Sequence, residues 1–160
     1  MDKAIEKVFV SNFESAQLIA ERLQFSKKKL RSLFPLSPQK IGRFEDETQE
    51  SVDALIKRFE QLEESIENKL FRGVLLLEQE DLSSKSKRDV TNLMEKFEIL
   101  DAADTWSYLL ILRNKLTNDY PNDAETQSDR INEVYKLTDY LFRILERLKK
   151  YVNDKKLAHI

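Results

Sequence analysis

Glycine and proline are scarce in this chain, and their scarcity constrains its fold more than any other feature. Only two glycines and three prolines occur in 160 residues. These residue types supply the backbone conformations of tight turns, so a chain that lacks them has few places to reverse direction. The sequence therefore predicts an all-α fold of long helices with few connections.

The spacing of apolar residues gives the same prediction. From residue 123 onward, apolar side chains recur at three- and four-residue steps, which places them on one face of a long helix. A second long helix follows the same pattern over residues 52–77, and Gly73 weakens it by about 1 kcal/mol relative to alanine. The N-terminal third has a similar apolar pattern and is expected to be helical as well.

Shorter helices are expected between these long ones. Residues 90–100 have helical spacing, and Ser84 or Ser86 is placed to cap that helix. Asp101 is placed to cap the helix that carries Trp106.

The positions of the connections can be predicted from the few helix-breaking residues, proline and glycine, that the chain contains. Residues 26–45 include Pro35, Pro38 and Gly42, so an irregular connection is expected there. The length fits one domain, and we expect residues 1–160 to form a single antiparallel bundle of about four or five helices.

Composition excludes several function classes. The 27 basic and 29 acidic residues nearly cancel, the chain has no cysteine, and no apolar run approaches the length of a membrane-spanning helix. A single histidine cannot supply the Glu-x-x-His pairs of a di-metal bundle. We therefore expect a cytoplasmic protein without metal or cofactor. The carboxylates of Glu63, Glu64 and Glu67 have basic neighbours and are interpreted as a solvated face.

Arg113 stands out in the Leu-rich stretch "LLILRNKLTNDYP" at residues 109–121. In a helix it shares a face with Trp106, Leu110 and Tyr120, where it interrupts an apolar surface. An arginine at such a position needs a carboxylate, a phosphate or several carbonyls as its partner. An intrachain salt bridge and the recognition of an anion both satisfy that need.

The same stretch resembles the motif of the HepT-like branch of the HEPN superfamily, which has an arginine, four residues, a histidine, one residue and a tyrosine. Arg113 and Tyr120 match the motif, and Asn118 stands in place of the histidine. The segments "SIENKLFRGVLLLEQED" and "MEKFEILDAADTWSYLLILRNKLTNDYP" extend the resemblance, which covers most of residues 35–150. It implies an antiparallel bundle similar to the substrate-binding subunits of nucleotidyltransferases.

The resemblance also implies roles for individual residues. Active members of the family are metal-independent ribonucleases that dimerise with their motifs facing each other, often beside a nucleotidyltransferase encoded as a partner or antitoxin. Arg113 would bind phosphate, and Tyr120 would accept an adenylyl group from the partner enzyme. Asn118 can hold a ligand by hydrogen bonds but cannot transfer protons near neutral pH. Asp119 is a further ligand-binding candidate, whereas His159 lies in a tail where helices usually fray.

Two functions follow from these residues. The first, which we favour, is a catalytically impaired toxin–antitoxin module that binds a nucleotide-bearing ligand, RNA or a nucleotidyltransferase. The alternative is a metal-independent endoribonuclease toxin of the HEPN type. Either version is expected to be a homodimer, because the face with Trp106, Leu110 and Tyr120 would otherwise leave apolar surface exposed.

Overall fold

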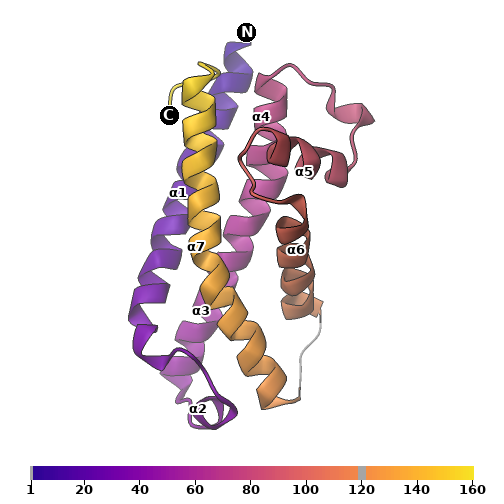
Figure 1. Cartoon of the computed structure of the whole chain (residues 1–160). Coiled ribbons are helices and arrows are strands. Elements are labelled where there is room, and N and C mark those ends of the chain that lie inside the picture. Colours follow the sequence, from indigo (N-terminus) through magenta and orange to yellow (C-terminus); the bar gives the residue numbers. More distant parts are fainter. Residues whose placement is uncertain (1, 119–121) are drawn as a thin grey trace.

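The computed structural model describes residues 2–118 and 122–160, and all of the regular structure in these ranges is helical (Figure 1). The α-helices are α1 (Lys3–Lys29), α2 (Pro38–Gly42), α3 (Asp46–Ser65), α4 (Arg72–Leu77), α5 (Lys87–Lys96), α6 (Ala103–Asn118) and α7 (Ala124–Asp154). A π-helical segment, Ile66–Phe71, joins α3 directly to α4, and two 3-10 turns, Arg31–Leu33 and Leu82–Ser84, lie in connections. The predicted all-α fold is confirmed.

The long elements pack as an antiparallel bundle. The chain descends through α1, returns through α3 and α4, descends again through α6 and returns through α7 (Figure 1). Helix α3 packs against α1 and α7, and α6 packs against α5 and α7. The short helix α5 lies between the ends of α4 and α6, and both termini lie at the same end of the bundle (Figure 1).

Polar side chains at the helix starts fix where several helices begin. Ser86 caps α5 in a capping box: its hydroxyl accepts from the Asp89 amide at 3.1 Å, and the Asp89 carboxylate accepts from the Ser86 amide at 2.8 Å. Asp123 caps α7 through the Glu125 amide at 3.0 Å. Ser86 was one of the two predicted caps. Asp101 precedes α6 by two residues, and its carboxylate accepts a hydrogen bond from Arg147.

The connection after α1 is shorter than predicted. Helix α1 continues to Lys29, and the three-residue turn and the short helix α2 occupy much of the segment that the breakers indicated. The ammonium group of Lys40 donates to the carbonyls of Leu33 and Pro35, both at 2.9 Å, and so holds the irregular part together. These bonds satisfy backbone oxygens that no helix uses.

One continuous apolar core fills the bundle, and Gly73 permits its closest helix approach. Phe9, Phe13, Phe59, Phe71 and Trp106 are all essentially inaccessible to solvent. A Cβ atom at Gly73 would lie 2.7 Å from Cδ2 of Phe9, which is closer than packed carbon atoms come. The packing of α1 on α4 therefore offsets the loss of helix stability that Gly73 causes. In the part of the chain that the model describes, no helix has the length and apolar character needed to cross a membrane.

Candidate functional site

The helix that carries the candidate site contains a π-helical segment. Leu62, Ile66, Leu70 and Val74 are fully buried at three consecutive four-residue steps. In an ideal α-helix each such step drifts by about 40°, so three steps would turn the last side chain well away from the first. The wider turn at Ile66–Phe71 absorbs an extra residue and keeps all four on the core side. Such π-helical segments are frequent at functional sites.

Arg113 lies on α6 opposite this helix and pairs with two carboxylates. Its Nε atom is 3.2 Å from Oε2 of Glu63, and its guanidinium group also contacts Glu64. The Arg113 side chain is 24% exposed, the Glu64 side chain is half exposed, and that of Glu63 is completely buried. Of the two partners that the sequence left open for Arg113, the structure contains the carboxylate.

Glu63 is the most perturbed acidic group of this cluster. Burial, reinforced by the charge of nearby Glu67, raises the pKa of Glu63 from 4.5 to about 7. Arg113 and Lys87 lower that pKa, but they do not offset the loss of water. Neither Glu63 oxygen has a hydrogen-bond partner, nor does Nε of Arg113, so the ion pair lacks the hydrogen bonds that usually stabilise buried charge. Glu63 therefore changes its protonation state near neutral pH.

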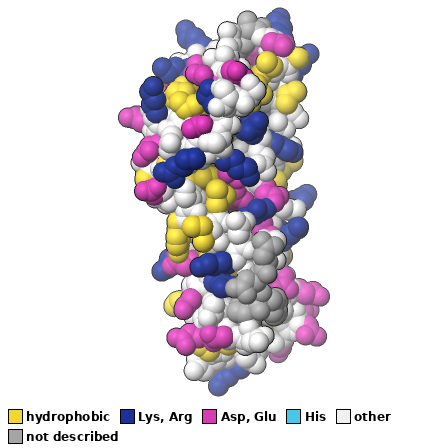
Figure 2. Space-filling model, turned by 90° about the vertical axis from the view of Figure 1, so that its right-hand side faces the viewer, with side chains coloured by type: hydrophobic (Ala, Val, Ile, Leu, Met, Phe, Trp, Pro, Cys, Tyr) yellow, Lys and Arg dark blue, Asp and Glu magenta, His cyan; other side chains and the backbone are white. Residues whose placement is uncertain are grey.

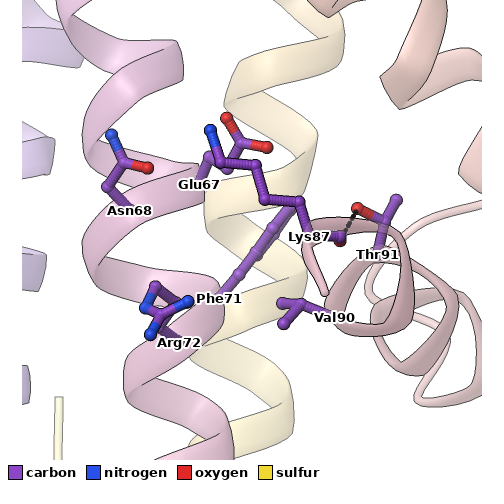
Figure 3. Close-up of a pocket in the computed structure, with 7 residues that line it drawn as sticks. All are labelled: Glu67, Asn68, Phe71, Arg72, Lys87, Val90 and Thr91. Carbon is purple, nitrogen blue, oxygen red and sulfur yellow. Dashed lines mark hydrogen bonds between the residues drawn. The ribbon is translucent and has the colours of Figure 1, made fainter. Parts of the chain in front are cut away.

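A small pocket connects this cluster to the protein surface. It measures about 20 Å³, which is room for one water-sized group. Phe71 forms one wall, while Lys87 extends across the pocket toward the Glu67 carboxylate (Figure 3). Thr91 is fixed beside it, because its hydroxyl donates to the Lys87 carbonyl at 2.9 Å. One oxygen of Glu67 is buried without a partner.

The interpretation of all three carboxylates as a solvated face was wrong. Glu64 is exposed as predicted, but Glu63 is in the core and Glu67 is partly buried. A signal was present in the sequence, because Glu63 follows Ile56 by seven residues and precedes Ile66 by three, and both belong to the apolar pattern. The prediction was wrong because it considered the neighbouring charges and not the position of Glu63 in the apolar pattern.

The other predicted site residues are only partly described. Asn118 is the last residue of α6, but its side chain lies outside the described part of the structure, as do Asp119 and Tyr120 altogether. The structure therefore does not say whether these side chains approach Arg113. Thr117, one turn after Arg113, donates to the Arg113 carbonyl at 3.1 Å and lies 3.4 Å from Glu60.

His159 does not belong to this cluster. The C-terminus lies at the end of the bundle opposite to the C-terminal end of α6 (Figure 1). The expectation of a frayed tail was wrong, since the Asn153 side chain donates to the Ile160 carbonyl at 2.9 Å and accepts from the Ile160 amide at 3.1 Å. Leu157 and Ala158 are buried by this docking, and His159 itself points to solvent.

The exposed face of α6 also differs from the predicted one. Trp106 is fully buried, with its ring 4.9 Å from that of Phe71, and Leu110 packs against the core. The apolar side chains that α6 exposes are instead Tyr108 (49% exposed) and Ile111 (55%). On this side of the molecule hydrophobic side chains lie among basic and acidic ones (Figure 2). Packing against Phe71 turns the indole inward and leaves the neighbouring face outward.

A second cleft, between the ends of α4 and α7, has a structural explanation. The Tyr151 hydroxyl donates to Glu78 at 2.6 Å, and Phe97 stacks on Tyr151 with 5.0 Å between ring centroids. The hydrogen bond fastens the end of α4 to α7, and the ring stacking fastens the residues after α5 to α7.

No group of three or more histidine or carboxylate side chains in the described residues is arranged to hold a metal ion. Comparison of the chain with protein-family models, with curated proteins and with solved structures gave no match.

Proposed function

We propose that this protein is a non-catalytic HepT-like module that binds a nucleotide-bearing ligand or a nucleotidyltransferase partner and acts as a homodimer. The observation that carries the proposal is the state of Arg113, a partly exposed guanidinium near the end of α6 whose buried partner makes no hydrogen bond with it. Such a group can exchange a carboxylate for a phosphate, because either anion presents two oxygens that can accept parallel hydrogen bonds from one guanidinium group.

The absence of an imidazole supports a binding role over catalysis. The chain's single histidine is the second-last residue, and an asparagine occupies the motif position. General acid–base transfer contributes about a hundredfold to ten-thousandfold to a reaction rate, and an amide cannot supply it.

An RNA-cleavage assay tests the proposal. The wild-type protein should cleave RNA no faster than the buffer background, and Asn118→His should raise cleavage by about a hundredfold if the motif is otherwise intact. Asn118→Gln is the matched control, since it adds volume without a titratable group. Rapid cleavage by the wild-type protein that Asp119→Ala abolishes would refute the binding role.

The ribonuclease alternative has one specific observation in its favour. Glu63 has a pKa of about 7 and lies 3.2 Å from Nε of Arg113, so a group of suitable proton affinity is near the motif arginine. Its complete burial separates it from any substrate in this conformation. Loss of wild-type cleavage in Glu63→Gln would favour this alternative.

Partner modification offers a second test. Co-expression with a cognate nucleotidyltransferase in the presence of ATP should add one adenylyl group to Tyr120, as the resemblance implies. Intact mass spectrometry of the wild-type protein and Tyr120→Phe measures this directly. An unchanged wild-type mass would contradict the modification.

The homodimer is proposed to use the exposed side chains of α6. Tyr108 and Ile111 lie close to the Arg88–Asp104 ion pair and to Glu133. A surface patch that carries both signs of charge can pair with the same patch on a second copy of the chain. Ile111→Glu should convert a dimer to an 18.9 kDa monomer in sedimentation at micromolar concentration. Val8→Glu is the control, because Val8 is similarly exposed but lies on α1. A wild-type monomer would refute the dimer.

A further inference from the structure

The carboxylates around Arg113 outnumber the two cations that act on Glu63. Glu63, Glu64 and Glu67 supply three carboxylates, while Arg113 and Lys87 supply two cations that act on them. Glu63 is completely buried and cannot be balanced by solvent ions. Arg72 adds an exposed cation at the pocket of Glu67, so the burial of Glu63, and not the number of charges, favours the binding of a proton there.

Glu63 and Glu67 are arranged to share that proton. They are four residues apart, on one side of the helix at the start of the π-helical segment. Glu67 raises the pKa of Glu63 through its charge and through a hydrogen bond that the two carboxyl groups can form. Two ionised carboxylates have no donor between them, so this hydrogen bond forms only when one of them is protonated. The proton would also give a partner to oxygens that otherwise have none.

Solvent reaches this pair through Glu67. Glu67 lines the small pocket, whose opening is bordered by the exposed side chains of Asn68 and Arg72, and Lys87 lies across it (Figure 3). Glu63 has no such contact with solvent. A proton can therefore enter at Glu67 and pass to Glu63 without unfolding of the helix.

We propose that Glu63, Glu67 and Arg113 form a proton-coupled oxyanion site, in which an anion that takes Arg113 from Glu63 causes the buried carboxyl to bind one proton. The inference rests on the proposed function in one respect, because it takes the ligand to carry a phosphate-type oxyanion. It adds a role for the buried carboxyl pair, which the proposed function leaves unused.

The exchange balances charge and protons. The Glu63–Arg113 ion pair separates, the guanidinium donates its hydrogen bonds to the anion, and the Glu63 carboxylate takes a proton from water through Glu67. Arg113 is one of the groups that lower the pKa of Glu63, so its departure raises that pKa further. Burial and Glu67 also raise the pKa of Glu63, and the charge of Lys87 lowers it.

The coupling predicts how anion affinity depends on pH. Below pH 7, Glu63 already holds its proton and does not compete for Arg113, so affinity should be constant there. Above pH 7, each bound anion requires the uptake of a proton, and affinity should fall by about tenfold per pH unit.

Sulfate is a suitable probe, because it remains a dianion throughout the neutral range. Its affinity for the 160-residue protein would be measured from pH 6 to pH 9, with proton uptake recorded in weakly buffered solution. The wild-type protein should take up close to one proton per sulfate at pH 8. Glu63→Gln should bind sulfate about tenfold more tightly than the wild type at pH 8, with no pH dependence and no proton uptake.

Three variants separate the coupling from a general loss of negative charge. Glu64→Gln removes the exposed partner and should keep the pH dependence. Glu67→Gln removes a group that raises the pKa of Glu63, so its pH midpoint should move to lower pH while the coupling persists. Arg113→Gln should abolish sulfate binding at every pH. Circular dichroism establishes that each variant is folded.

The outcomes distinguish the inference from the function on which it rests. Sulfate binding that requires Arg113 but is equally independent of pH in the wild type and Glu63→Gln would overturn the proton coupling and leave the ligand-binding function intact. If neither protein binds sulfate or a dinucleoside monophosphate, the proposed ligand itself is wrong. If Glu64→Gln loses the pH dependence and Glu63→Gln keeps it, the proton is bound at the exposed carboxyl and the inference is overturned.

Discussion

Two arginine–carboxylate pairs in this bundle have opposite surroundings. Arg147 on α7 donates to Asp101 at 2.6 Å, and both side chains are more than a third exposed. Arg113 on α6 lies 3.2 Å from Glu63, which solvent does not reach, and no hydrogen bond joins them. The exposed pair has the better geometry, and the buried pair has the larger electrostatic consequences.

The difference shows that burial, and not pairing itself, decides what an ion pair contributes. An exposed pair keeps most of its hydration and contributes roughly 0 to 1 kcal/mol. A buried carboxylate loses its hydration, and an attractive charge offsets that loss only with good hydrogen-bond geometry. Glu63 keeps a raised pKa beside a guanidinium, so in this cluster the loss of water outweighs the attraction.

The largest expected effect is an increase in stability in Glu63→Gln at pH 8. The pKa of Glu63 is about 7 in the folded protein against 4.5 for an unperturbed glutamate, so the folded state binds this proton more tightly than the unfolded chain does. Wild-type stability should therefore fall as the pH rises from 4.5 to 7, by about 3 kcal/mol at most. A glutamine cannot ionise, and its amide can donate to Glu67, so the variant should lack this decrease.

Urea unfolding of the wild type and Glu63→Gln at pH 5 and pH 8 measures this difference. Glu64→Gln removes a carboxylate from the neighbouring exposed position and serves as the control, with an expected change below about 0.5 kcal/mol. The capping residues Asp81, Asp89 and Asp123 do not interfere, because hydrogen bonds lower their pKa values below 3.8. Equal pH dependence in the wild type and Glu63→Gln would refute our account of the buried pair.

A smaller effect of opposite sign is expected from Arg113→Met. Loss of the guanidinium should destabilise the protein at pH 8 by about 1 to 2 kcal/mol. Without it, Glu63 avoids an unpaired buried charge only by taking up a proton, and this uptake costs free energy at pH 8. At pH 5 the carboxyl is already neutral, and the loss should be smaller. Thermal unfolding at both pH values measures it. A larger loss at pH 5 than at pH 8 would show that Arg113 stabilises the protein by packing and not through Glu63.

Sequence patterns predicted the fold better than they predicted this site, for physical reasons. Apolar spacing indicates which face of a helix is buried, so α7 and the helix from α3 through α4 could be predicted from their patterns. The cap at Ser86 was predictable as well, because a serine before a helix is a local signal. Both features depend on residues that are neighbours along the chain.

The polar cluster depends on contacts that such patterns do not contain. The π-helical segment that follows Glu63 changes the phase of the helix by about one residue, and no fixed spacing predicts where that change occurs. The burial of Trp106 against Phe71 likewise depends on how α6 is rotated in the bundle. The need of Arg113 for a partner followed from its position, whereas the identity of Glu63 as that partner required the packed structure.

The smallest expected effect is the loss of the exposed pair, through Arg147→Gln or Asp101→Asn. Each side chain can be hydrated when its partner is removed, so neither leaves a buried charge. Each single variant should therefore change the free energy of unfolding by less than about 1 kcal/mol, and the double variant should show a coupling energy of similar size. Urea unfolding in low and high salt provides the measurement, since salt should remove what remains of an exposed interaction. A coupling energy above about 2 kcal/mol that persists in high salt would mean that hydrogen-bond geometry outweighs burial, and the contrast between the two arginines would have to be explained by geometry instead.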